Sequence, residues 1–374
     1  MKAIQLDDRL TLGSQAIRKR SRAKVRRDPS VSKVALGAAA LAAAGASFAA
    51  FESYRTRKAE RDNPPLGHFI EVDSVRLHTL DCGRDAGPAE AHASKLGRPV
   101  VLIHGNGVML EDFVISGVVG RVAGAHRVIC FDRPGFGHSE RPHDRLWTPR
   151  AQASLLLRAL ARMGVERPIV VGHSFGALVA LAMALEHPEA IAGIVLISGY
   201  YYPSARLDVP VFAPPAIPVI GDVLRHTVAP TIGRIIRPAV IRAMFSPRRT
   251  PERFKQDFPL AMMVRPSQIR AAAEDAAVMV PAAAEMAPFY RSLAIPALIL
   301  AGAEDAIVST RDQPARLNAE LPQNELWAEP GIGHMLHYAA PDLVVDAIDR
   351  VDAWAALPSK RPDFPKHQPT PGID

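Results

Sequence analysis

The sequence predicts an α/β protein with a mostly parallel sheet, and three observations support this prediction. Short apolar runs alternate with helix-prone segments between residues 66 and 357, an order typical of a sheet with helices on its faces. The apolar run 168–171 leads into the pentapeptide Gly-His-Ser-Phe-Gly at 172–176 and then into a helix-prone run. Two later apolar runs end in turns that carry Asp305 and His334.

Each apolar run is short enough for a strand and is bounded by turn residues. The first two form a predicted hairpin around Asp73-Ser74. The expected strands are 69–72, 75–80, 100–103, 127–131, 169–171, 193–197, 297–300 and 325–327. The expected helices of the sheet-bearing part are 148–163, 175–186, 310–320 and 341–356.

Residues 199–290 interrupt this alternation, since they are rich in proline and contain no clear strand. An insertion of this length between two strands of one sheet is typical of a cap packed over the strand ends. Short helices are expected around 219–228, 232–245, 251–263 and 267–279. The apolar side chains of this predicted cap either face a substrate or form the cap's own small core. Our candidates for substrate binding are Phe212, Met244 and Phe245.

The net charge of +7 is confined to the N-terminus. Residues 1–33 carry ten basic and three acidic side chains, which accounts for the whole excess. The remaining chain is neutral, so the globular part has no charge bias toward polyanions, and we expect no nucleic-acid partner.

Residues 34–51 follow this basic arm and carry no charge. A helix of that length reaches roughly 27 Å, just short of a bilayer's hydrocarbon core. We interpret it as an N-terminal membrane anchor with the catalytic domain on the non-cytoplasmic side. A cleaved export signal and an alanine-rich helix of a cytoplasmic protein remain alternatives. Residues 52–65 are predicted to be a linker, and the proline-rich tail 358–374 is predicted to be disordered.

The pentapeptide at 172–176 has the form of a nucleophile elbow, in which a strand, a strained turn and a helix present a serine. A serine hydroxyl needs a general base, and that base needs an orienting acid. Both partners are expected later in the chain, on turns after late strands. Ser174 is therefore the predicted nucleophile, His334 the base and then acid, and Asp305 the orienting carboxylate.

Acyl transfer also needs donors for the oxyanion. The backbone N–H of Phe175 directly follows the nucleophile and is the first predicted donor. The loop His-Gly-Asn-Gly at 104–107 supplies the second, for which we predict the backbone N–H of Asn106. The Asn106 side chain is a further candidate.

No metal or organic cofactor is expected. The sequence shows neither a metal-ligand cluster nor a dinucleotide-binding loop before a helix. His173 and His337 are interpreted as packing or pocket-lining residues. The two cysteines, Cys82 and Cys130, do not decide the redox compartment, and a disulfide between them stays open.

Residues 66–357 resemble the α/β-hydrolase fold superfamily, in its cap-bearing branch of esterases, carbon–carbon bond hydrolases and haloperoxidase-like enzymes. The resemblance is carried by the segments 104–107, 132–139 (Asp-Arg-Pro-Gly-Phe-Gly-His-Ser), 172–176, 302–305 (Gly-Ala-Glu-Asp) and 333–335 (Gly-His-Met). It implies an eight-stranded, mostly parallel sheet formed by residues 66–198 and 291–357, with 199–290 as the helical cap.

Two positions depart from the pattern of related branches. Epoxide hydrolases and haloalkane dehalogenases carry aspartate at the elbow, where this chain has Ser174. Many relatives have proline where this chain has Gly107, so the oxyanion loop is expected to differ from theirs.

Together these features predict a serine hydrolase that cleaves a carboxylic ester with an apolar acyl or alkyl part. A carbon–carbon bond hydrolase and a cofactor-free perhydrolase would use the same residues. A non-catalytic, membrane-tethered binding protein is the alternative of another class. The sequence leaves the substrate and the oligomeric state undetermined.

Overall fold

The computed structural model describes residues 29–83, 97–205 and 213–357. The predicted tail 358–374, most of the basic arm and the candidate residue Phe212 lie outside these ranges. The chain divides into two compact units, with the division between Phe48 and Ala49. The second unit contains the sheet and its surrounding helices.

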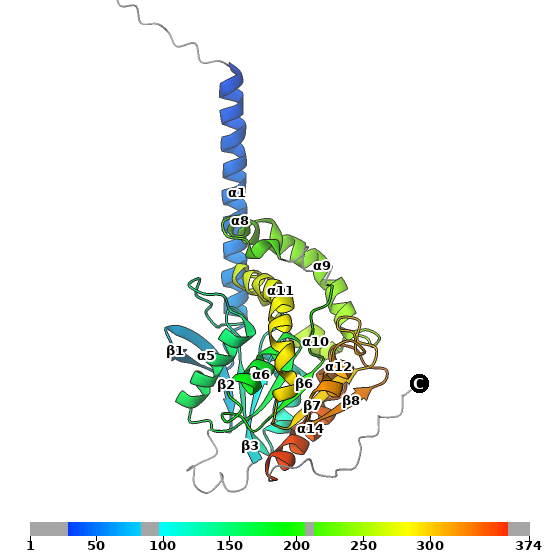
Figure 1. The fold of residues 1–374 in the computed structure, drawn as a ribbon. Helices are drawn as coiled ribbons and strands as arrows, with labels where there is room; N and C mark the ends of the chain where they lie inside the picture. The colour runs from blue at the N-terminus through cyan, green and yellow to red at the C-terminus, as the bar shows by residue number, and fades with distance from the viewer. Residues whose placement is uncertain (1–28, 84–96, 206–212, 358–374) are drawn as a thin grey trace, which may run out of the picture. The chain divides into compact units, whose positions relative to one another are not determined.

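Eight strands form one sheet in the order β1-β2-β4-β3-β5-β6-β7-β8 (Figure 1). β1 pairs antiparallel with β2, and β2 pairs antiparallel with β4. All the other neighbours are parallel. The strands are β1 (His68–Val72), β2 (Val75–Cys82), β3 (Gly97–Ile103), β4 (His126–Phe131), β5 (Ile169–His173), β6 (Gly193–Ile197), β7 (Ala297–Gly302) and β8 (Asn324–Glu329). The predicted mostly parallel, eight-stranded sheet is confirmed.

Helices cover both faces of this sheet. Two buried clusters show the layers: one contains side chains of α5, α6 and α12, and the other contains side chains of α3, α4 and α14. The helices of the sheet-bearing part are α3 (Glu111–Ser116), α4 (Val118–Val122), α5 (Pro149–Arg162), α6 (Phe175–Glu186), α12 (Pro314–Glu320), α13 (Leu336–Ala339) and α14 (Pro341–Ala355). Because α3, α4 and α13 are only four to six residues long, they offer too little periodicity to be recognised in the sequence.

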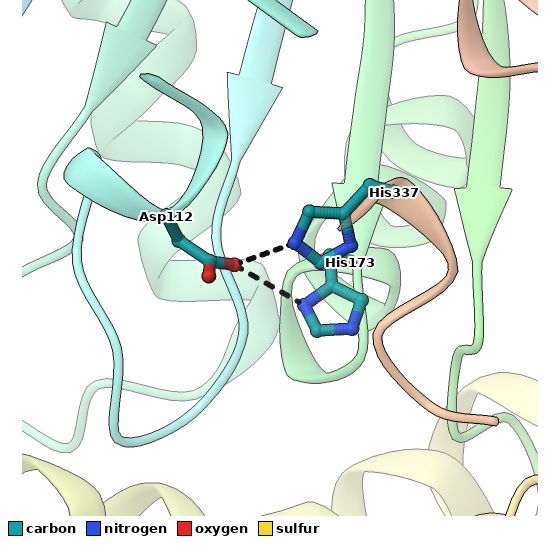
Figure 2. A group of neighbouring side chains, drawn as sticks. All are labelled: Asp112, His173 and His337. Atoms are coloured by element: carbon teal, nitrogen blue, oxygen red, sulfur yellow. Dashed lines mark hydrogen bonds and ion pairs between the residues drawn. The ribbon is translucent and has the colours of Figure 1, made fainter. Parts of the chain in front are cut away.

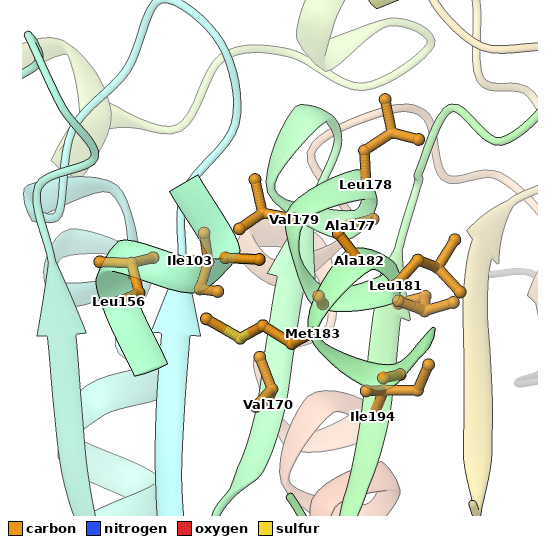
Figure 3. Close-up of a cluster of buried hydrophobic side chains, with 14 of the residues drawn as sticks. Ile103, Leu156, Val170, Ala177, Leu178, Val179, Leu181, Ala182, Met183 and Ile194 are labelled. Atoms are coloured by element: carbon orange, nitrogen blue, oxygen red, sulfur yellow. The ribbon is translucent and has the colours of Figure 1, made fainter. Parts of the chain in front are cut away.

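The helix that follows the pentapeptide is buried on all sides. Every residue of α6 from Phe175 to Ala184 is buried, as expected for a helix that is apolar all round. Figure 3 shows its leucine, valine and methionine side chains packed among Ile103 of β3, Val170 of β5 and Ile194 of β6. Large-to-alanine truncations at such positions cost about 2–5 kcal/mol of unfolding free energy. The packing holds the N-terminus of α6, and with it Ser174, in a rigid frame.

Only helices connect β6 to β7 in the part of this segment that the structure describes. They are η1 (Pro214–Ala216), α8 (Ile220–His226), α9 (Val228–Phe245), α10 (Glu252–Asp257), η2 (Met262–Val264), α11 (Pro266–Met286) and η3 (Ala287–Ser292). The predicted helices overlap α8, α9, α10 and α11. Side chains of α9, α10 and η2 meet those of the sheet-bearing part in a separate apolar cluster that contains Ile241, Phe254, Met262, Met109 and Tyr338.

The N-terminal helix α1 (Pro29–Asp62) extends further than the sequence predicted. Residues 52–65 were expected to form a linker, but they are helical as far as Asp62, and Glu52 and Ala59 are buried. Arg234 pairs with Glu52, and Arg265 pairs with Glu60 at 2.8 Å. These tertiary contacts order a segment whose charged composition alone resembles a linker. Among the described residues, Leu36–Asp62 is the one helix long and apolar enough to cross a membrane, by length and composition.

Candidate active site

Ser174 lies on a strained turn between β5 and α6. Its φ of 53° and ψ of −116° place it in a region that side-chain-bearing residues rarely occupy, at a cost of about 1–3 kcal/mol. Its N–H donates to the carbonyl of Ile197 at 2.9 Å, which ties the turn to the end of β6. The serine side chain is partly exposed while its neighbours are buried. This is the geometry expected of a nucleophile elbow.

Two glycines make this turn possible. A Cβ on Gly172 would lie 2.3 Å from the carbonyl oxygen of Gly176, and a Cβ on Gly176 would lie 2.2 Å from that of Ile103. Real Cβ atoms do not approach backbone oxygens so closely. The spacing Gly-x-Ser-x-Gly is therefore required by backbone contact on both sides of the serine.

His334 and Asp305 meet on the turns that follow β8 and β7. The Nδ1 atom of His334 lies 2.8 Å from Oδ2 of Asp305, and both side chains are almost fully buried. The other carboxylate oxygen of Asp305 accepts from the N–H groups of Ile307 and Val308 at 2.8 and 2.9 Å. The backbone thus fixes the carboxylate and the carboxylate fixes the imidazole. With Nδ1–H donated to Asp305, Nε2 carries the lone pair that a general base needs.

A histidine contact joins the turn of Ser174 to His334, the predicted base. His173 directly precedes Ser174, its ring centre lies 5.0 Å from that of His334, and its Nε2 lies 3.2 Å from the carbonyl oxygen of His334. The carboxyl ends of the parallel strands β5, β7 and β8 share one edge of the sheet. Ser174, Asp305 and His334, which are far apart in the sequence, are thereby brought to the same edge.

Behind the predicted triad, two histidines face one carboxylate. Figure 2 shows the imidazoles of His173 and His337 directed at Asp112, whose Oδ2 lies 2.9 Å from Nε2 of His337. Burial, together with the neighbouring rings of His337 and His334, lowers the pKa of His173 well below its ordinary value. His173 is therefore neutral, and its Nε2–H donates to the carbonyl of His334. The packing role predicted for His173 and His337 agrees with this arrangement.

Among the described residues, Asp112, His173 and His337 could converge on a cation. One potential ligand atom from each of them lies within 4.8 Å of the others. The hydrogen bond between Asp112 and His337 already occupies that geometry. An ion would have to replace this hydrogen bond.

The loop after β3 lies against the serine. A Cβ on Gly105 would be 3.1 Å from the Cβ of Ser174, so the backbone at Gly105 packs against the turn of Ser174. The Asn106 side chain donates to the carbonyl of Ala272 on α11 at 3.0 Å. Its amide nitrogen is therefore engaged by α11, while the backbone N–H remains our predicted oxyanion donor. The φ of Gly107 is 78°, which proline cannot adopt, so the departure from the family pattern follows from the loop's conformation.

Arg133 organises this loop, and sequence reasoning missed it. Its guanidinium donates to the carbonyls of His104 at 2.8 Å and Gly105 at 2.9 Å, and its N–H donates to Nε2 of His104 at 2.9 Å. Burial and the charge of Arg133 lower the pKa of His104 to about 3. His104 is thus a neutral ring that accepts through Nε2. An arginine within segment 132–139 was the sequence signal that could have indicated this role. Only the tertiary structure shows that its side chain reaches His104 and Gly105.

Asp132 and Gly137 of the same segment shape the loop that follows β4. Both oxygens of Asp132 accept hydrogen bonds, from the backbone N–H groups of Leu110 and His138 and from the ring of His78. Gly137 has a φ of 50°, and a Cβ there would overlap the Asp132 carboxylate. The segment therefore forms a tight loop around a buried carboxylate.

The candidate substrate-binding residues are less clearly placed. Phe245 is buried in the cluster that α9 and α10 share with Tyr338, and Met244 packs against that cluster. Phe245 also lines a cavity of about 180 Å³ together with Gly333 and Met335, the residues that flank His334. Phe212 lies outside the described residues. Phe245 and Met244 thus belong to an apolar cluster, and their contact with a substrate stays a prediction.

The comparisons with known proteins agree with this geometry. A family model described as "Alpha/beta hydrolase family" matches residues 100–347. A 2-hydroxymuconate semialdehyde hydrolase of Pseudomonas putida is 31% identical over 138 residues, which cover 37% of this chain and 45% of that protein. The chain thus spans less than half the length of this curated relative. Haloalkane dehalogenase 2 of Mycobacterium bovis is 26% identical over 299 residues, covering 76% of this chain and 94% of the dehalogenase.

A solved structure shares the fold. An esterase from Thermogutta terrifontis, in a malate-bound structure, superposes with a TM-score of 0.58 at 20% identity, covering 76% of this chain and 97% of the esterase. At this level of identity the similarity concerns the fold alone. It confirms the predicted architecture of an eight-stranded sheet with flanking helices.

Proposed function

Because the chain belongs to the alpha/beta hydrolase family, we propose that it is a serine hydrolase that cleaves a carboxylic ester through an acyl-enzyme. One observation carries the proposal: the buried pair of His334 and Asp305, with 2.8 Å between Nδ1 and Oδ2, at the sheet edge where the strained turn presents Ser174. A base oriented by a carboxylate, on the same sheet edge as a partly exposed serine, is the arrangement that nucleophilic catalysis needs.

In the proposed reaction, Oγ of Ser174 bonds to the carbonyl carbon of the ester while Nε2 of His334 takes the proton of the serine hydroxyl. The carbonyl electrons move to the oxygen, and the backbone N–H groups of Phe175 and Asn106 stabilise that charge. As the first residue of α6, Phe175 has an N–H with no acceptor inside the helix. The intermediate collapses when the bond to the alcohol oxygen breaks and His334 returns its proton to that oxygen. Water then attacks the acyl-enzyme by the same steps and releases the acid.

We propose that the substrate has an apolar acyl or alkyl part and that residues 199–290 serve as the cap. The apolar cluster around Phe245 lies beside the cavity that Gly333 and Met335 line. Asn106 is bonded to α11, so the cap helices are linked to the oxyanion loop. A substrate bound between cap and sheet would contact both.

A carbon–carbon bond hydrolase is the second candidate. It is favoured by the 31% identity, over 138 residues, to a 2-hydroxymuconate semialdehyde hydrolase. It would use the same three residues on a ketone instead of an ester. A perhydrolase would also use them, with peroxide in place of water. Product analysis with an aryl ester, a vinylogous diketone and peroxide separates these chemistries.

The test of the proposed nucleophile is intact-protein mass after reaction with a fluorophosphonate, on the parent and on Ser174→Ala. We expect one adduct on the parent and none on the variant, with circular dichroism unchanged. Ester turnover should fall by at least about a thousandfold in Ser174→Ala and in His334→Ala. A folded parent protein that forms no adduct would instead favour the non-catalytic binding protein.

We propose further that residues 34–51 anchor the chain in a membrane, with the catalytic domain on the non-cytoplasmic side. The charge-free run and the basic arm before it support this topology. Protease digestion of intact cells or sealed vesicles tests it. Catalytic-domain fragments that are cut only from the non-cytoplasmic side would agree. Release of the whole chain by high salt, without detergent, would disprove the anchor.

A further inference from the structure

The helices α8 and α9 expose an unusual number of large apolar side chains. Val219, Val223 and Ile235 are 74%, 61% and 73% exposed. Contiguous exposed apolar surface on a soluble fold marks an interaction site. We call the exposed side chains of α8, α9 and the residues just before them the apolar face; they are Ile217, Val219, Ile220, Val223, Val228, Ile232, Ile235 and Val240.

The two sides of α9 are reversed relative to an ordinary surface helix. Val228, Ile232 and Ile235 follow a spacing of four and three residues, so they lie along one side of the helix, and that side is exposed. On the opposite side, Arg234 and Arg237 point toward other elements: Arg234 pairs with Glu52 of α1, and Arg237 donates to the carbonyl of Leu260 at 2.8 Å. This part of the helix therefore presents apolar side chains to the surroundings and turns Arg234 and Arg237 toward neighbouring elements, whereas Arg242 near its C-terminus is exposed.

The arginine side of α9 lines a cavity of about 360 Å³. Four arginines line it: Arg55, Arg234, Arg237 and Arg265. Glu52 and Glu60 pair with Arg234 and Arg265, whereas no carboxylate of the described residues pairs with Arg55 or Arg237. Burial and the charges of Arg234 and Arg55 lower the pKa of Arg237. We call this cavity the arginine pocket; its uncompensated positive charge fits an anion such as a phosphate.

The position of the arginine pocket in the chain indicates where that phosphate comes from. Arg55 follows the charge-free run 34–51 by one helical turn, and its guanidinium lies 5.5 Å from the ring centre of Phe51, the last residue of that run. Phe51 and Tyr54 are both more than half exposed. Aromatic and basic residues at the end of an apolar helix are typical of the depth of lipid headgroups.

We propose that α8 and α9 dock on the surface of a bilayer, with the apolar face among the acyl chains and the phosphate of an anionic lipid in the arginine pocket. The contact adds a second membrane attachment to the anchor proposed above and goes beyond it. It places the cap at the lipid surface, so amphiphilic esters held in the bilayer are the substrates that this arrangement delivers. An apolar face combined with basic residues is the recognised composition of interfacial helices.

The test uses the full chain reconstituted into phosphatidylcholine vesicles with and without phosphatidylglycerol. An environment-sensitive fluorophore is attached at Val223→Cys in a Cys82→Ser background, because Cys130 is buried. The matched control carries the label at Ala319→Cys, an exposed position on α12. We expect a blue-shifted emission at position 223 and quenching by spin-labelled lipids several times stronger than at 319. Equal and weak quenching at both positions in vesicle-bound protein would overturn the proposal while leaving the anchor intact.

Two variants test the lipid charge. In the parent, quenching at 223 should increase with phosphatidylglycerol; Arg237→Gln should abolish that increase, and the exposed control Arg291→Gln should keep it. If both variants keep the increase in quenching, the arginine pocket is not a phosphate site. A blue shift that rises with protein concentration and does not respond to quencher lipids would show that a second copy covers the apolar face, which also overturns the proposal. Failure of the chain to associate with vesicles at all would overturn both this proposal and the anchor.

Discussion

Arg133 and Asp275 form an ion pair whose Nη1 and Oδ2 atoms are 2.5 Å apart, with neither side chain exposed to solvent. Arg133 lies in the loop after β4 and Asp275 on α11, so the pair joins the sheet-bearing part to the helices between β6 and β7. The same guanidinium holds the carbonyls of His104 and Gly105. Asp275 also pairs with Arg141 at 3.0 Å. One buried carboxylate thus stabilises two arginines, one of which holds the backbone of the proposed oxyanion loop.

We expect Asp275→Asn to lower the free energy of unfolding by up to about 3–5 kcal/mol, because Arg133 and Arg141 would lose their buried counter-charge. Urea denaturation followed by circular dichroism measures the change. Glu274→Gln is the matched control, since Glu274 pairs with Arg141 and Arg270 at a more exposed position, and it should cost less than half as much. Equal losses in the two variants would contradict the role given to burial.

Asp305→Asn is expected to lower kcat by about four orders of magnitude while the protein stays folded. The amide oxygen of the new side chain would keep the N–H groups of Ile307 and Val308. Its NH2 group would then face Nδ1 of His334, donate to it and favour the wrong tautomer of the imidazole. The control is Glu304→Gln, the exposed neighbour, which should keep near-parental kcat. Ester hydrolysis under saturating substrate gives both values. If Glu304→Gln proved the more damaging change, the assignment of the acid would be wrong.

Gly105→Ala should reduce ester turnover more than it reduces stability. The added Cβ would lie 3.0 Å from Nδ1 of His173 and 3.1 Å from the Cβ of Ser174. The turn of Ser174, or the loop with the proposed Asn106 donor, must therefore give by a few tenths of an ångström. Gly120→Ala on α4 adds the same methyl group where nothing lies within 4 Å. It should leave kcat unchanged and the melting temperature equal or slightly higher. Parental kcat in Gly105→Ala would argue against this loop as the oxyanion site.

Glu111 gives a prediction on pH. Burial and the charge of Asp132 raise the pKa of its carboxyl to about 8. A raised folded-state pKa contributes stability that is fully present below the unfolded value, near 4.5, and is lost as the pH rises toward 8. Glu111→Gln removes this loss, so the variant should gain melting temperature relative to the parent between pH 5 and 8. The exposed Glu166→Gln is the control. A constant difference across this range would show that Glu111 is already ionised in the folded protein at pH 5.

Local signals were sufficient to predict the sheet and the elbow. The strands are short β-branched runs, and α6 is a continuous apolar run, so their type follows from composition and length. The glycines around Ser174 and the turns that carry Asp305 and His334 are also local, which is why the sequence alone could nominate all three residues. Segment 52–62 shows the limit of this reasoning, because its helix depends on contacts of Glu52 and Glu60 with distant arginines.

The sequence by itself determined the order of the elements and nominated the residues that we propose as catalytic, since both depend on neighbours along the chain. Only the tertiary structure decided what long side chains reach across the fold. It joined Arg133 to His104, Gly105 and Asp275, and it set His173 against His334. It also turned Arg234 and Arg237 of α9 toward a cavity and left Val228, Ile232 and Ile235 exposed. These contacts link residues far apart in the chain, and their formation depends on how the sheet edge and helices pack together.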